Sequence, residues 1–128
     1  MMTPQATAVR KWIGRARSIH DRLCPYEQAA KGLDGACGTD PILRERDRLR
    51  AQEAVARMEL YEALAHSSLT PRQFTILNLH YLQYESWNRI SVRLQIERRY
   101  ALQVHTQAIE RLASQIQICE IDEARSAG

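Results

Sequence analysis

Glycine is confined to a few places in this sequence, and its distribution constrains the fold more than any other feature. Three of the five glycines in the 128 residues, Gly32, Gly35 and Gly38, lie close together, and the next is Gly128 at the end of the chain. Because glycine and proline are the strongest breakers of regular structure, this distribution predicts one main loop over residues 32–41. A chain of this length is too short for two full domains.

The residues before the loop predict a helix. Their apolar side chains recur in alternating steps of three and four residues, the spacing of a face that packs along another helix. Pro25 is expected to kink or end this helix near Cys24. The seam suits a contact within the chain or the interface of a homodimer, and its members are Val9, Trp12, Ala16, Ile19, Leu23, Tyr26 and Ala30.

A second, longer helix is predicted after the loop. Asp40 can cap it, Pro41 suits its first position, and no breaker follows before residue 66. Its early turns alternate charges of both signs, and an apolar stripe begins only in its middle. The stripe consists of Ala51, Ala54, Val55, Met58, Tyr61 and Ala65. The fold class is therefore predicted to be all-α, with residues 1–66 forming an antiparallel two-helix hairpin.

Residues 67–116 are predicted to form a separate unit of three short helices. Thr70, Pro71 and Gln73 supply an N-cap, a first-turn proline and the far partner of a capping box for a helix over residues 71–82. Ser86 can cap the next helix. Trp87 lies in the first turn of that helix and is expected to be a core residue. The third is expected over residues 98–113, with a buried face made of Ala101, Val104, Ala108 and Leu112. Residues 117–128 are expected to be a frayed tail.

The last two of these helices predict an interface for DNA. Two short helices joined by a tight turn form a helix-turn-helix, in which the second helix lies in the major groove. Arginine recognises guanine, glutamine recognises adenine, and Thr or Leu can touch a thymine methyl group. Residues 67–116 carry six arginines against three acids, and residues 1–32 are also basic enough to contact phosphates. The candidate DNA-binding residues are Arg98, Arg99, Leu102, Gln103 and Thr106 on the last helix, with Arg72 and Arg89 outside it.

Other classes of function find little support in the sequence. The four histidines have no nucleophile or paired carboxylate at a suggestive spacing, so we do not expect an enzyme. His20, Cys24 and Cys37 lack a fourth metal ligand, and neither a metal nor a cofactor is predicted. Three cysteines without a framework spacing indicate reduced thiols. With no apolar run long enough to span a membrane and no leader, the expected location is the cytoplasm.

The stretch LTPRQFTILNLHYLQYESWNRISVRLQIERRYALQVHTQAIERL resembles region 4 of bacterial sigma factors and, more closely, the C-terminal half of phage-encoded RinA/ArpU-type transcriptional regulators. The matching positions are Leu69, Pro71, Leu79, Tyr81, Ser86, Trp87, Ile90, Leu94, Arg98, Val104, His105, Ala108 and Leu112. The resemblance implies a helix-turn-helix that binds double-stranded DNA to control transcription in a phage or prophage. It also implies left-handed turns where the family has glycine and this chain has Tyr84 and Gln95, at about 1–2 kcal/mol each.

Two alternatives use the same helices. The first is a DNA-packaging adaptor of the small-terminase type, which would assemble as a ring. The second is a helical protein-interaction module that contacts RNA polymerase or a sigma factor. A homodimeric regulator would place two recognition helices about one DNA turn apart.

Overall fold

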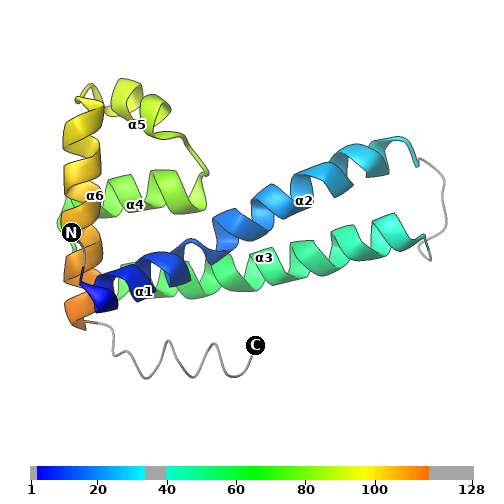
Figure 1. Cartoon of the computed structure of the whole chain (residues 1–128), viewed down its shortest axis with the longest axis horizontal. Coiled ribbons are helices and arrows are strands. Elements are labelled where there is room, and N and C mark those ends of the chain that lie inside the picture. The colour runs from blue at the N-terminus through cyan, green and yellow to red at the C-terminus, as the bar shows by residue number, and fades with distance from the viewer. Residues whose placement is uncertain (1–2, 34–39, 116–128) are drawn as a thin grey trace.

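The computed structural model describes residues 3–33 and 40–115, and over these ranges its regular structure is entirely helical, which confirms the predicted all-α class. The elements are α1 (Pro4–Ile13), α2 (Arg15–Lys31), α3 (Pro41–Ala65), α4 (Pro71–Leu77), the π-helical turn η1 (Asn78–Leu82), α5 (Trp87–Leu94) and α6 (Arg98–Gln115). Helices α2 and α3 run antiparallel as a long arm, and the remaining helices gather around α6 at one end (Figure 1). Most of the predicted loop and the whole predicted tail lie outside the described residues.

The N-terminal helix is divided at Gly14. The Gly14 N–H donates to the Arg10 carbonyl, and the chain then continues into α2 after the short break visible in Figure 1. As a result α1 packs against α6, whereas α2 packs against α3. Pro25 was expected to kink or end the helix near Cys24. It does not end the helix, because α2 continues to Lys31. Pro25 removes only the bond to the carbonyl of Asp21, and both residues are exposed, so water can take its place.

Helix α3 begins as predicted but turns a different face inwards. The Asp40 carboxylate accepts a hydrogen bond of 2.8 Å from the Ile42 N–H. The buried residues of the helix are Leu49, Ala56, Leu60 and Leu64. The apolar stripe from Ala51 to Ala65 is exposed instead, with Met58 66% exposed.

Polar residues at the border of the inward face of α3 explain this outcome. Glu53 accepts hydrogen bonds from the Tyr84 hydroxyl at 2.7 Å and contacts His20 Nδ1 at 3.0 Å. Arg57 donates to the backbone carbonyl of Leu82. Because these groups have partners only in the folded chain, their half-buried positions could not be recognised from hydropathy.

The main hydrophobic core crosses the boundary predicted between residues 66 and 67. It joins α1, the C-terminal end of α3, α4, η1 and the C-terminal half of α6. Its buried members are Ala6, Val9, Ile13, Leu60, Leu64, Leu77, Tyr81, Leu82, Ala108, Ile109, Leu112 and Ala113. The N-terminal helix is thus part of the same core as the C-terminal helices.

A second, smaller core holds the N-terminal half of α6 in place. It consists of Ile76, Leu79, Ile90, Ala101 and Val104, and therefore joins α4, η1, α5 and α6. The Thr70 capping box is present as predicted, but the predicted helix over residues 71–82 changes into the π-helical turn η1 at its end. The wider turn distributes neighbouring side chains of one segment between the two cores.

Tyr84 and Gln95 are the two non-glycine residues with positive φ in the described chain, at 60° and 55°. They occupy the turns before α5 and between α5 and α6. These are the positions at which the resemblance described above implies glycine. Tyr84 is held by its hydrogen bond to Glu53, by stacking on His20 at 4.0 Å and by Arg57 at 5.3 Å from its ring. Gln95 is exposed, and its backbone N–H donates to the Val92 carbonyl.

Exchanging each of these residues for glycine is expected to have opposite effects. Gln95→Gly should stabilise the fold by about 0.5–1 kcal/mol, since it removes left-handed strain and loses no side-chain contact. Tyr84→Gly should destabilise it, because the lost contacts outweigh the same relief. Urea unfolding measures both. Gln107→Gly in α6 is the matched control and should cost about 1 kcal/mol, and an equal cost for Gln95→Gly would contradict the strain at the turn.

Candidate nucleic-acid interface

The first turns of α6 are fixed in orientation by α5. The Ser86 hydroxyl caps α5 by accepting from the Arg89 N–H at 3.2 Å. Residues 95–97 then turn the chain into α6, and this turn is closed by the Ile96 N–H donating to the Ser91 carbonyl at 3.1 Å. The Ser91 hydroxyl donates to the carbonyl of Ile96. With Ile90 packed on the buried face of α6, the two helices form a rigid pair.

The five candidate residues of α6 lie on one side of its N-terminal half. Arg98, Arg99 and Gln103 are exposed. Leu102 and Thr106 are half-buried at the edge of this surface, and the Thr106 hydroxyl donates to the Leu102 carbonyl at 3.1 Å. Within residues 3–33 and 40–115, no ion pair engages either arginine. The guanidinium groups are therefore available to an anionic partner.

The exposed surface of α6 is rotated slightly from the predicted one. The buried face includes His105, Ile109 and Ala113 in addition to the four predicted residues. Packing of α1 against α6 buries the latter two, and that packing joins segments about 100 residues apart. As a result Tyr100, which is 47% exposed, and Gln107 join Arg99 and Gln103 on the open side.

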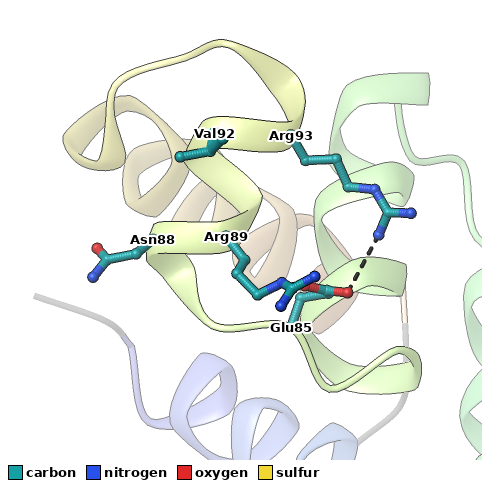
Figure 2. A pocket seen from close by; sticks show the side chains of 5 residues that line it. All are labelled: Glu85, Asn88, Arg89, Val92 and Arg93. Atoms are coloured by element: carbon teal, nitrogen blue, oxygen red, sulfur yellow. Dashed lines mark hydrogen bonds and ion pairs between the residues drawn. The ribbon is translucent and has the colours of Figure 1, made fainter.

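Arg72 and Arg89 are outside this helix, as expected, and differ in their surroundings. Arg72 is exposed in the first turn of α4. Arg89 pairs with Glu85 at 2.8 Å, and Arg93 reaches the same carboxylate at 3.3 Å. Figure 2 shows both arginines directed towards Glu85, with Val92 exposed on another side of α5.

The pocket in Figure 2 is lined by acidic, basic and apolar side chains. Its volume is about 450 Å³, and α5 with Glu85 lines it. The Glu85 side chain is only 16% exposed and balances part of the arginine charge. Arg93 was missed as a candidate, although its spacing of four from Arg89 places both on one face of a helix.

A compact group of aromatic and histidine side chains lies behind α6. The Tyr81 hydroxyl and His105 Nε2 are 2.6 Å apart, and His80 stacks on Trp87 with 4.2 Å between ring centroids. Burial lowers the pKa of both His80 and His105 to about 4. Burial also raises the pKa of Tyr81, so its hydroxyl remains a donor to the neutral imidazole. The group joins η1, α5 and α6 without adding charge.

A basic groove follows α1 and α2. Arg10, Lys11 and Arg22 line a pocket of about 690 Å³ together with the hydroxyl of Ser18. Arg17 has a structural role, since it donates to the backbone carbonyl of His80 at 2.8 Å. Of the cations for which phosphate contacts are predicted, Arg17 is thus engaged within the fold.

No group of three or more His, Cys, Asp or Glu side chains suited to a metal occurs in the described part of the chain. Cys37 lies outside the described residues. Among the described residues, no helix is both apolar and long enough to cross a bilayer. Comparisons with protein family models, curated proteins and solved structures give no match to this chain.

Proposed function

We propose that this protein is a sequence-specific DNA-binding regulator of transcription, of the phage or prophage type. The observation that carries the proposal is the exposure of Arg98, Arg99 and Gln103 on the N-terminal half of α6, while α5 braces the opposite side. A helix about 10–12 Å in diameter fits the major groove, which is about 12 Å wide. Helices α5 and α6 then serve as a helix-turn-helix.

Each exposed side chain has a role that its chemistry suits. Arg99 donates to O6 and N7 of guanine, and Gln103 pairs with N6 and N7 of adenine, each pair contributing about 1–3 kcal/mol of discrimination. Arg98 lies at the helix N-terminus, where the dipole also favours a phosphate. Leu102 and Thr106 contact a thymine methyl group from the edge. Arg72, Arg89 and Arg93 supply phosphate contacts, the latter two weakened by Glu85.

The double variant Arg98→Ala/Arg99→Ala tests this proposal. Fluorescence anisotropy with random and promoter-derived duplexes over a salt series should show weaker binding. The slope of log K against log salt concentration should become shallower by about one unit for each lost phosphate contact, because fewer counterions are released. Loss of Arg99 should also reduce the preference for one sequence over another.

The matched control is Arg44→Ala/Arg111→Ala. It removes the same charge from exposed positions on the arm and at the far end of α6. We expect its salt slope to stay within about half a unit of the native value. Equal effects of the two double variants would show that DNA binding depends only on the net charge of the protein. An unchanged affinity after loss of Arg98 and Arg99 would show that α6 is not part of the DNA interface.

Two exposed apolar side chains favour a second candidate. Val92 is 78% and Tyr100 is 47% exposed, and both lie near the arginines of α5 and α6. Such a mixture suits a protein-interaction module that contacts RNA polymerase or a sigma factor. Salt-dependent binding of the isolated protein to DNA would contradict a module that has lost its affinity for DNA.

A further inference from the structure

The exposed apolar stripe of α3 has no partner within the described chain. We call it the α3 ridge, and its members are Ala51, Ala54, Val55, Met58, Tyr61 and Ala65. Val55, Met58 and Tyr61 are 59%, 66% and 58% exposed, and they include three of the five large apolar side chains that the described residues leave open. A contiguous row of this kind marks an interaction surface.

The spacing of the α3 ridge is that of a helix-packing seam. Positions 51, 54, 58, 61 and 65 alternate steps of three and four, which is the a/d pattern of a coiled coil. Helix α2 packs on the other side of α3, through the face that contains Leu49, Ala56 and Leu60. One helix therefore carries two packing faces, and one of them is occupied.

Shallow grooves follow both sides of the α3 ridge. One, of about 450 Å³, lies between α3 and α2 and includes Ile19 and Ala51 in its wall. The other, of about 480 Å³, lies between α3 and η1 beside Met58 and Tyr61. A ridge with a groove on each side is the shape that fits a second ridge of the same kind.

The charge on α3 indicates which partner fits. Residues 41–50 contain four arginines and two acids, a net charge of +2, whereas residues 51–65 contain one arginine and three acids, a net charge of −2. In an antiparallel pair with position 58 opposite position 54 of the second copy, the apolar positions between 51 and 61 face one another, and residues 47–50 of each copy lie opposite residues 62–65 of the other. This alignment brings Arg48, which also pairs with Glu45 of its own helix, near Glu62 of the second copy. A parallel alignment would oppose like charges.

We propose that the α3 ridge is the interface of an antiparallel homodimer. A helix of 25 residues is about 37 Å long and about 10 Å wide. This footprint is smaller than the roughly 800 Å² per partner of a standard interface, so the dimer dissociates on dilution, with a Kd of about 1–100 µM. Its two-fold symmetry extends the proposed function, because paired α6 helices then require an inverted-repeat DNA site.

Sedimentation equilibrium of the full chain without DNA tests the dimer independently of DNA binding. The mass should rise with concentration from 14.8 kDa towards twice that value. Met58→Glu places two like charges close to the symmetry axis and should raise the Kd at least about tenfold, with an unchanged helical circular dichroism spectrum. Val92→Glu, an equal change at an exposed position of α5, should leave the Kd unchanged.

Charge reversal tests the antiparallel alignment. Arg48→Glu and Glu62→Arg should each raise the Kd by about fivefold, because two pairs are affected in a symmetric dimer, and the double variant should restore it. Additive loss in the double variant would overturn the antiparallel arrangement. A monomer at all concentrations, a mass unaffected by Met58→Glu, or a closed ring of more than two chains would overturn the proposed dimer.

Discussion

Lowering the pH from about 6.5 to about 4 is expected to remove a large part of the stability of this protein. The cause is a pair of histidines behind α6, the half-buried His80 and the buried His105, whose pKa values desolvation lowers to about 4 from the ordinary value of 6.5. Arg10 and Arg17 lie close enough to oppose a positive charge on His80 as well, and Arg10 acts on His105 in the same way. Both imidazoles must therefore stay neutral in the folded state.

The direction of the effect follows from proton linkage. Between pH 4 and pH 6.5 the unfolded chain binds protons at these histidines and the folded chain does not, so the free energy of unfolding falls as the pH is lowered through this window. The contribution is complete above about pH 6.5. A fully buried histidine adds up to about 1.4 kcal/mol per pH unit, and solvent screening reduces the share of the half-buried His80. Since the whole stability of a small domain is about 5–15 kcal/mol, the loss expected by pH 4.5 is a large fraction of it.

Urea unfolding between pH 7.5 and pH 4.5 measures this dependence above the range in which most carboxylates titrate. His105→Gln keeps a hydrogen-bonding partner for the Tyr81 hydroxyl but cannot titrate, so it should reduce the slope by about half. His66→Gln is the control, because His66 is exposed at the end of α3. A full slope in His105→Gln would show that the titration resides elsewhere.

Ile13→Ala is expected to lower the free energy of unfolding by about 2–5 kcal/mol. Ile13 is 1% exposed at the end of α1 and belongs to the core that includes Leu64, Ile109 and Leu112. Removing its side chain leaves a cavity between α1 and the C-terminal helices. Because these segments share one core, the loss should also appear in α6.

Chemical denaturation gives the total effect, and amide hydrogen exchange locates it. Protection of the buried amides of α6 should fall together with that of α1 in Ile13→Ala, as for one cooperative unit. Val92→Ala, at a position that is 78% exposed, should change the stability by less than about 0.5 kcal/mol. Unchanged protection in α6 would mean that α1 is an appendage, as a boundary at residue 66 would require.

Local signals in the sequence were sufficient for the ends of most helices. The caps at Asp40, Thr70 and Ser86 were predicted because each side chain accepts from a backbone N–H two or three residues ahead. The candidate residues of α6 could be identified for a similar reason, since positions on one helix share a face through the helical period alone. Their proposed contact with DNA remains a prediction.

Features that depend on packing could not be predicted in this way. The sequence of α3 has apolar residues on two faces of the helix. Which face packs against α2 depends on partners for Glu53 and Arg57 that other segments supply. The histidines at positions 80 and 105 have no common signal in the chain, and only the fold brings them against Tyr81 and Trp87.

By itself the sequence determined the all-α class, the starts of α3, α4 and α5, and the row of polar residues along the first half of α6. These depend on interactions within a few residues, which the local order of side chains specifies. Tertiary structure alone decided that α1 covers α6, that the α3 ridge faces outwards, and that His80 and His105 are held without charge behind α6. Those outcomes depend on contacts between distant segments, where apolar burial and the pairing of polar groups are settled together.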